Sequence, residues 1–344
     1  MRRLLNTLYV TIQGAWLARE RENILVRVDQ ETRLRLPIHN LGAIVGFGQV
    51  SASAPLMGLC AERGVMICFL SEQGRFLARV EGPVSGNVLL RRQQYRQSDD
   101  AQQAARIAST LVAAKIANSR FVIQRTLRDR GGSQEISALR GAVDHLRSLL
   151  RQVRADNLGL DIIRGYEGAA ARTYFDVFDK LIVNNTKEFR FQGRNRRPPL
   201  DPVNAILSFL YTLLRHDIAS ALEGVGLDPA VGYLHRDRPG RPALALDLME
   251  ELRAPLADRM ALTLINRAQL KPKDFLVTES GAVKMSDEAR KTILVAWQER
   301  KRETIRHPFL DETVEIGLIP HLQARLLAGY LRGDLDAYPA FIWR

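Results

Sequence analysis

The sequence has little cysteine. Cys60 and Cys68 are the two thiols among 344 residues, and both stand in apolar surroundings. A disulfide framework or a cysteine-rich zinc site requires more thiols at defined spacings. We therefore interpret both cysteines as buried free thiols in a protein from a reducing compartment.

Long apolar runs are also missing. No window approaches the length of a membrane-spanning helix, and the arginines near the N-terminus are not followed by the apolar region and cleavage site of a signal peptide. We therefore expect a cytoplasmic protein without a membrane partner. Hydrophobic residues still make up 46% of the chain, which is enough for a globular core. At 344 residues, two cores or one large core with an appendage are expected.

Several catalytic motifs are absent. The chain has no G-x-x-x-x-G-K-[ST] phosphate loop and no G-x-S-x-G elbow, so P-loop nucleotide hydrolysis and α/β-hydrolase chemistry have no support. His235-Arg-Asp237 mimics the catalytic triplet of protein kinases, but Pro242 stands where that motif needs asparagine. No glycine-rich loop precedes the triplet, so we reject a kinase.

Positive charge is in excess. The chain carries 50 Lys and Arg against 38 Asp and Glu, a net charge of +12. A basic surface attracts polyanions and releases their counterions, so nucleic acid is the expected partner. The densest basic stretch spans residues 187–197, where Phe189 and Phe191 alternate with basic side chains. Phosphate binding is the functional interpretation of this stretch, and a solvated loop is the alternative.

Two kinds of sequence pattern divide the chain. Short β-branched or aromatic runs between turn residues predict strands in the first part, and a helix fits near 53–62. The predicted strands are 8–12, 23–28, 33–36, 65–70 and 76–80. Beyond residue 87, apolar residues recur at helical spacing. The later predicted helices are 165–183, 202–216, 246–264 and 286–302. We therefore predict an α+β fold, with a small β-rich domain at 1–92 followed by a larger all-α domain at 93–344.

One histidine on a turn is followed by an acidic helical run. His235 precedes Asp247, Glu250 and Glu251, which occupy positions i, i+3 and i+4 and so share roughly one face of the predicted helix. Carboxylates crowded on one face repel each other unless a cation or a basic partner lies there. Imidazole and carboxylates held on a rigid element suit a divalent metal. The alternative is that Arg253 neutralises Glu250.

A second acidic position completes this pattern. Glu167 lies in the early turns of a predicted helix, among small residues that let a backbone or a phosphate come close. Taken alone, it reads as a solvated glutamate; taken with His235, it indicates a metal-dependent nuclease site. Arg172 and Tyr174 lie on a neighbouring face, where they could form a phosphate clamp or an internal hydrogen bond.

A polar stripe opens another predicted helix. Asp201 is placed to cap it and Pro202 to take its first position. Asn204, Ser208 and Tyr211 then follow at i, i+4 and i+7 of an otherwise apolar helix. The stripe is either a buried set of hydrogen bonds or a support for metal ligands.

Four segments together resemble one known family. They are RGYEGAAARTY at 164–174, RPPLDPVNAILS at 197–208, GYLH at 232–235 and LDLMEELR at 246–253. Over its whole length the chain resembles the CRISPR-associated integrase/endonuclease, the first-numbered and nearly universal Cas protein. It looks most like the version found in subtype I-C systems.

The resemblance implies a site and an architecture. The β-rich domain would form a two-fold dimer, and the α-helical domain would be catalytic and bind Mg²⁺ or Mn²⁺ through Glu167, His235 and Glu250. Asp247 would be a further catalytic acid of variable role. Some members place aspartate where this chain has Glu250, and both residues offer an oxygen ligand. We expect alanine at any of the three ligands to abolish activity without unfolding the protein.

The resemblance also implies a function and partners. The family captures double-stranded protospacer DNA and joins its 3′-hydroxyl ends to the CRISPR repeat by transesterification. Two homodimers are bridged into a heterohexamer by a small ferredoxin-like companion. The residues expected to bind nucleic acid or support the ligands are Arg172, Tyr174, Arg190, Arg194, Arg196, Arg197, Asn204, Ser208 and Arg253. The alternatives are a non-catalytic architectural nucleic-acid-binding protein and a metal hydrolase acting on a small phosphoester.

Overall fold

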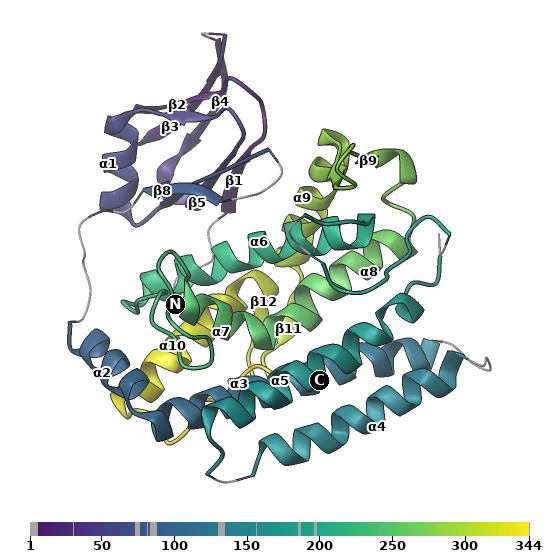
Figure 1. Ribbon diagram of the computed structural model, residues 1–344. Helices are drawn as coiled ribbons and strands as arrows, with labels where there is room; N and C mark the ends of the chain where they lie inside the picture. The colour runs from purple at the N-terminus through teal and green to yellow at the C-terminus, as the bar shows by residue number, and fades with distance from the viewer. Residues whose placement is uncertain are drawn as a thin grey trace. The chain divides into compact units, whose positions relative to one another are not determined.

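The chain divides into two compact units, Met1–Gly86 and Asn87–Arg344 (Figure 1). The structure is a computed structural model that describes residues 6–29, 31–72, 76–80, 82, 88–129, 135–155, 157–184, 187–195 and 198–343. Helix α2 (Val88–Asp99) lies wholly in the second unit, so a boundary after residue 92 would cut it. A β-rich region followed by a mostly helical one confirms the predicted α+β class.

The first unit contains two four-stranded sheets. One sheet has the order β1-β5-β7-β8, with the first three strands parallel and the last antiparallel. Its strands are β1 (Asn6–Val10), β5 (Leu41–Phe47), β7 (Met66–Leu70) and β8 (Phe76–Val80). The other sheet has the order β4-β3-β2-β6. Its strands are β4 (Glu31–Pro37), β3 (Asn23–Val28), β2 (Trp16–Glu20) and β6 (Ser51–Ala52).

The sequence patterns missed β2 and β5. Strand β5 is a central parallel strand and is buried along nearly its whole length, so it lacks the alternation that marks half-exposed strands. Its Gly46 also interrupts the apolar run, for a steric reason. A Cβ there would lie 2.9 Å from Val50 Cγ1, so the close approach of the following turn requires glycine.

The predicted helix near 53–62 is confirmed as α1 (Ala54–Arg63). Ser53 caps it by accepting a hydrogen bond from the Leu56 N–H, and Gly64 ends it in the left-handed conformation. Cys60 and Cys68 are buried free thiols, as predicted. Burial raises the pKa of the Cys60 thiol to about 12, so it stays protonated and packs as an apolar residue.

The second unit is built around one long helix. Helix α3 (Ala101–Asp129) packs against α4 (Glu135–Val153), α5 (Leu160–Asp176) and α7 (Ala243–Leu252) (Figure 1). On its other side α7 contacts α6 (Pro202–Gly224), which also packs on α10 (Ile319–Arg332). The predicted break at 131–133 lies outside the described residues.

The predicted helix 246–264 is divided in three. Helix α7 passes into a π-helical segment, η3 (Arg253–Asp258), and then into α8 (Arg259–Asn266). Pro255 explains the change, because it has no N–H to donate to the carbonyl of Glu251 four residues earlier. The side-chain amide of Asn118 on α3 donates to that carbonyl instead, at 2.7 Å. The free carbonyl is therefore satisfied by a neighbouring helix.

Short strands also interrupt the helices, so the predicted all-α domain is mostly helical rather than all-α. Two small hairpins flank helix α9 (Asp287–Arg302). They are β9 (Phe275–Val277) with β10 (Val283–Met285), and β11 (Thr304–Arg306) with β12 (Thr313–Glu315). Among the described helices, none combines the length and apolarity needed to cross a membrane.

Candidate active site

Asp247 fixes the position of His235. Its carboxylate accepts hydrogen bonds from the backbone N–H groups of Tyr233, Leu234 and His235 at 2.6, 3.0 and 3.0 Å. The ring Nδ1 of His235 lies 2.7 Å from the same carboxylate. A ring that donates its Nδ1 proton to Asp247 keeps a free lone pair on Nε2. Because Asp247 is fully buried and its oxygens are occupied, we interpret it as a positioning residue.

Glycine is required next to this carboxylate. A Cβ on Gly232 would lie 2.7 Å from Asp247 Oδ2 and 2.8 Å from the backbone carbon of Ala243. The turn can therefore wrap three N–H groups around Asp247 because residue 232 has no side chain.

Two other helices hold the His235 loop. Gln94 of α2 donates to the carbonyls of Asp228 and Val231, both at 2.8 Å. Ser98 of α2 donates to the Gly232 carbonyl at 2.8 Å. Arg164 of α5 donates to the Leu234 carbonyl at 2.7 Å. The loop is thus fixed by side chains that the sequence patterns did not single out.

Glu167, His235 and Glu250 come together, and Lys115 lies among them. The Lys115 ammonium is 2.7 Å from Glu250 Oε2 and also bonds Glu167 Oε1. His235 Nε2 lies 3.8 Å from Glu250 Oε1 on the side of that carboxylate that also binds Arg253, at 2.9 Å. Helices α3, α5 and α7 each contribute one charged group, and the His235 loop contributes the imidazole.

The charges in this cluster hold each other ionised. Burial by itself would raise the pKa of Glu250, but Arg253 and then Lys115 outweigh it and lower the pKa to about 2. Burial likewise opposes the charged form of Lys115, yet Glu250 and Glu167 raise the pKa of its ammonium. Glu250 is 1% exposed and Lys115 is 8% exposed, so neither charge is shielded by bulk water.

Lys115 was missed in the sequence. The signal was present, because it is a lone charge in the apolar run 111–116 of a predicted helix. A lysine inside an apolar helix face is seldom buried without an acidic partner. Its partners lie on helices distant in sequence, which a helical repeat does not reveal.

The donor atoms suit a divalent metal. Two carboxylates and one imidazole are ligands that Mg²⁺ and Mn²⁺ accept, and the buried Glu250 Oε2 is held by an ion pair with Lys115. In the described part of the chain, no three His, Cys, Asp or Glu side chains surround a common point suited to a metal. The reason is local, because the Lys115 ammonium already bonds both carboxylates.

Glu251 does not share the face of Asp247 and Glu250, contrary to the sequence interpretation. Its carboxylate points to the C-terminal segment, where Tyr338 Oη donates at 2.5 Å and the Phe341 N–H at 2.6 Å. Gln323 donates to it as well, at 3.2 Å. Burial raises the pKa of Glu251 to about 7, and these donors offset part of that rise.

Arg253 links Glu250 to the basic loop. It pairs with Glu250, as the alternative interpretation proposed, and its guanidinium lies 5.3 Å from the ring centre of Tyr211. The guanidinium of Arg194 lies 5.1 Å from the same ring. Tyr211 in turn donates to Asp258 at 2.7 Å. A chain of stacked groups therefore runs from the acidic cluster to the 187–195 loop.

The polar stripe on α6 is a set of internal hydrogen bonds. Asn204 is fully buried; it accepts from Arg194 at 2.6 Å and donates to the Gly193 carbonyl at 2.8 Å. Ser208 accepts from Arg194 at 3.3 Å. Asp201 caps the helix at the Asn204 N–H, as predicted. Asn204 and Ser208 thus hold the loop through Arg194, whose guanidinium lies over the same Tyr211 ring as that of Arg253.

The remaining predicted nucleic-acid residues separate into exposed and buried groups. Arg172 and Arg190 are exposed, whereas Tyr174 is buried at 3% exposure beside Asp258. Tyr174 is therefore an internal residue and not a phosphate clamp. Arg196 and Arg197 lie outside the described residues.

The two phenylalanines of the basic stretch anchor it to the core. Phe189 and Phe191 are buried, and Phe191 packs on the ring of Phe178 at 5.0 Å between centres. The stretch is therefore not a fully solvated loop: its apolar side chains point inward, while Arg190 between them points to solvent.

Sequence comparison places the chain among known proteins. A family model described as CRISPR associated protein Cas1 matches residues 8–299. A CRISPR-associated endonuclease Cas1 from Rhodospirillum rubrum is 54% identical over 100% of both chains. Another from Chlorobaculum tepidum is 52% identical, also over 100% of both chains.

Solved structures share the fold. A Cas1 protein from Thermotoga maritima has a TM-score of 0.81 at 22% identity and covers 96% of this chain and 97% of its own. A casposase bound to integration product has a TM-score of 0.79 at 22% identity, with 99% and 94% covered. A chain of a Cas6-RT-Cas1–Cas2 complex has a TM-score of 0.82 at 24% identity, covering 100% of this chain and 36% of that one.

The fold and the site define a class: a β-rich unit followed by a mostly helical unit, in which a lysine joins two glutamates and a histidine lies beside one of them. The match over residues 8–299 and the two full-length relatives then identify the family. The chain belongs to the CRISPR-associated Cas1 family.

Proposed function

We propose that this protein is a metal-dependent DNA endonuclease and integrase of CRISPR adaptation. The observation that carries the proposal is that Lys115 joins Glu167 to Glu250, while His235 Nε2 lies 3.8 Å from Glu250 Oε1. The names of its relatives, which are endonucleases, and the shared fold of a casposase bound to integration product support it. The net charge of +12 favours a polyanionic substrate.

Glu167, His235 and Glu250 would hold Mg²⁺ or Mn²⁺. When bound, the ion supplies Lewis-acid polarisation of the scissile phosphate and stabilises the charge that develops on its oxygens. Asp247 keeps His235 Nε2 directed at the site. Arg253 and Tyr211 hold Glu250 and the basic loop in place. For the ion to bind both glutamates, the Lys115 ammonium has to move away from at least one of them, because it bonds an oxygen of each.

The reaction needs positioning more than covalent chemistry from the protein. The 3′-hydroxyl oxygen of a protospacer end attacks a repeat phosphorus and forms a new phosphodiester bond. The phosphorus–oxygen bond to the neighbouring repeat nucleotide breaks, and that nucleotide leaves with a 3′-hydroxyl. The exposed Arg172 and Arg190 would neutralise DNA phosphates nearby. If water replaces the 3′-hydroxyl, the same displacement is hydrolysis.

The finer features of the proposal concern assembly. They are a subtype I-C origin, a homodimer formed by the first unit, a small ferredoxin-like companion in a heterohexamer, and a cytoplasmic location. The shared fold with a chain of a Cas6-RT-Cas1–Cas2 complex supports a companion subunit. Ile12, Trp16 and Leu77 of the first unit are 51%, 43% and 49% exposed, and they are candidates for a dimer contact.

Strand joining in vitro tests the proposal. The purified protein, its companion, a short duplex and supercoiled plasmid are incubated with Mn²⁺ or with EDTA. We expect joined product with Mn²⁺ and none with EDTA. His235→Ala should lose at least ~10³-fold in joining rate, because the imidazole is a ligand rather than a packing residue. Asp247 keeps three backbone N–H donors without the ring, so the variant's melting temperature should stay close to that of the wild type.

DNA affinity separates the alternatives. If the protein is an enzyme, the His235→Ala variant should fail to join strands but should still bind the duplex with nearly wild-type affinity. Equal loss of binding and joining would instead support a non-catalytic architectural protein. A substrate affinity that does not depend on salt would support a hydrolase of small phosphoesters.

A further inference from the structure

Two arginines from two helices lie over the ring of Trp343, and a third arginine acts electrostatically on one of them. Arg259, the first residue of α8, has its guanidinium 4.9 Å from the Trp343 ring centre, and that of Arg300 on α9 is 5.5 Å away. Arg125 on α3 is near enough to act electrostatically on Arg259. The backbone N–H of Trp343 donates to the Asn118 side-chain oxygen at 2.8 Å, which fixes the tryptophan against α3.

Positive charge exceeds negative charge in this cluster. Glu303 pairs with Arg300, but Arg259 has no carboxylate partner in the described part of the chain. Its Nη1 is buried and makes no hydrogen bond. Arg125 is exposed. Arg300 therefore has a direct ion pair with Glu303, whereas Glu303 acts on Arg259 only electrostatically.

This imbalance is costly for the folded protein. Burial, and then repulsion from Arg125 and Arg300, lowers the pKa of Arg259 to about 10. Two other basic groups inside this unit are balanced, since Lys115 bonds two glutamates and Lys301 pairs with Asp217 at 3.0 Å. An uncompensated cationic cluster at a half-buried position indicates a missing anion.

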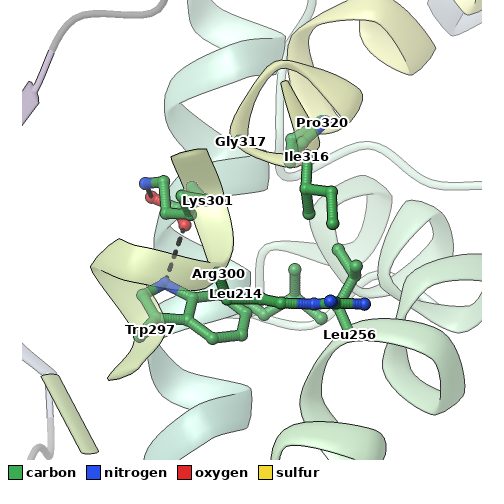
Figure 2. A pocket seen from close by; sticks show the side chains of 9 residues that line it. Leu214, Leu256, Trp297, Arg300, Lys301, Ile316, Gly317 and Pro320 are labelled. Carbon is green, nitrogen blue, oxygen red and sulfur yellow. Dashed lines mark hydrogen bonds and ion pairs between the residues drawn. The ribbon is translucent and has the colours of Figure 1, made fainter. Parts of the chain in front are cut away.

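The anion has to approach from the solvent side. Behind Arg300 lies a cavity of about 10 Å³, lined by Leu214, Leu256, Trp297 and neighbouring residues (Figure 2). It has room for about one water molecule and its lining is largely apolar, so it is no place for a charged ligand. Figure 2 shows the Arg300 side chain extended across this cavity from Trp297 towards Leu256.

We infer that Arg125, Arg259 and Arg300, with Trp343 as an aromatic support, form a phosphate-binding site for a nucleic-acid strand that does not depend on the metal. A guanidinium fork matches the geometry of a phosphate, and a tryptophan ring holds the guanidinium planes in place. The inference rests on the proposed function, because it assigns a further contact to the same DNA substrate. An acidic protein segment is the competing ligand.

The position of Arg125 on α3 indicates how far this contact lies from the acidic cluster. Arg125 lies ten residues beyond Lys115 on the same helix, which is roughly 15 Å along its axis at 1.5 Å per residue. At about 3.4 Å of axial rise per nucleotide, that distance corresponds to about four nucleotides of a duplex strand. The site would therefore bind a phosphate several nucleotides away from the scissile one.

Duplex binding in EDTA tests the inference without the metal site. Fluorescence anisotropy is measured on a short duplex for wild type, Arg125→Gln and a matched exposed control on α9, Arg302→Gln. We expect Arg125→Gln to weaken binding about 5- to 10-fold and to reduce the salt slope by about one, as for one lost phosphate contact. Arg302→Gln should change affinity less than about twofold. Equal effects of the two substitutions would overturn the inference.

Stability measurements supply a second, independent test. Without DNA, Arg125→Gln should raise the melting temperature, because it removes repulsion on Arg259. Added duplex or inorganic pyrophosphate should stabilise the wild type more than the variant. A variant that melts lower and binds DNA normally would show a merely structural cluster and reject the site. Stabilisation by poly-glutamate but not by duplex would reject nucleic acid as the ligand.

These outcomes are separable from those of the proposed function. Calorimetry of Mn²⁺ binding to the wild type examines the acidic cluster alone. Failure of Mn²⁺ to bind, with DNA affinity still sensitive to Arg125→Gln, would reject the metal-dependent enzyme and keep the phosphate site. Normal Mn²⁺ binding and strand joining, with Arg125→Gln binding DNA like the wild type, would keep the metal-dependent enzyme and reject the phosphate site.

Discussion

Glu250 and Glu251 are neighbours on α7, and their surroundings on the two sides of the helix shift the pKa values of the two carboxylates in opposite directions. Both are at most 1% exposed. Glu250 faces Arg253, Lys115 and His235, and its pKa falls to about 2. Glu251 faces neutral donors from Gln323, Tyr338 and the Phe341 backbone, and its pKa rises to about 7. Burial alone does not decide the charge of a carboxylate; the formal charge of its partners does.

The difference assigns separate tasks to the two sides of α7. The Glu250 side is a balanced set of charges in which one cation can replace another. The Glu251 side joins the helix to the C-terminal segment by hydrogen bonds at 2.5 and 2.6 Å. One side therefore supplies donor atoms, and the other fixes the helix that carries them.

The largest effect is expected from removing Glu250 from the charged side of α7. Glu250→Ala leaves the Lys115 ammonium and the Arg253 guanidinium without their shared carboxylate. We expect a loss of about 3–5 kcal/mol in unfolding free energy, measured by urea denaturation, because a buried charge loses its partner. Glu167→Ala should cost less, since the Glu167 side chain is 28% exposed. The burial of Glu250 is the reason why we expect alanine here to cost more stability than at Glu167.

Lys115→Met supplies the matched control. Without metal, it leaves Glu167 and Glu250 facing each other and should destabilise the protein by a similar amount. Added Mn²⁺ should restore more stability to Lys115→Met than to the wild type, because no ammonium has to be displaced. The double variant Glu250→Gln/Lys115→Met should be more stable than Glu250→Gln alone. If Lys115→Met is as stable as the wild type without metal, the balanced-charge account is wrong.

Part of this site could be predicted from the sequence. The spacing of His235 and the α7 acids, together with Glu167 among small residues, indicated a cation-binding cluster, and the family resemblance named Glu167, His235 and Glu250 as its ligands. Lys115 could not be found that way, because helical periodicity reports which face of a helix is buried and not what lies opposite it. Glu251 was assigned to the wrong side for the same reason: its neighbours come from the last residues of the chain.

The fold shows the same division. Turn residues and amphipathic spacing located α1, α6 and α9, because caps and periodicity are local properties. The π-helical segment after α7 depends on Asn118 of α3. The Asn118 side-chain amide donates to the Glu251 carbonyl, to which Pro255 has no N–H to donate, and this is a contact between helices. Strand β5 is buried by its neighbours in the sheet and so shows no alternation. Local rules predict elements, and contacts between elements decide the exceptions.

A pH titration sharpens the comparison. Glu251 has a raised pKa, so the native state binds more protons than the unfolded state between about pH 4.5 and 7. Its contribution to stability is therefore present at low pH and is lost as pH rises through that window, by roughly 3 kcal/mol. Glu250, with a lowered pKa, contributes stability that is present above pH 4.5 and lost towards pH 2.

Glu251→Gln isolates this effect, because the amide keeps an acceptor and does not ionise. Unfolding free energies measured from pH 5 to 8 should fall more steeply for the wild type than for the variant. Glu251→Gln should then become the more stable protein near pH 8. Parallel pH profiles for the two proteins would contradict the raised pKa of Glu251.

The smallest expected effect concerns the turn that positions His235. Gly232→Ala places a methyl group 2.7 Å from Asp247 Oδ2, so the turn or the carboxylate has to shift. We expect a loss of about 1–3 kcal/mol in stability, as for other overpacked sites. Mn²⁺ affinity should fall roughly tenfold, because Asp247 no longer fixes the imidazole. Gly141→Ala on α4, with nothing within 4 Å of its added Cβ, is the control and should stabilise the helix slightly. Calorimetry that finds equal Mn²⁺ affinity in both variants would show that metal binding does not need the Asp247 turn.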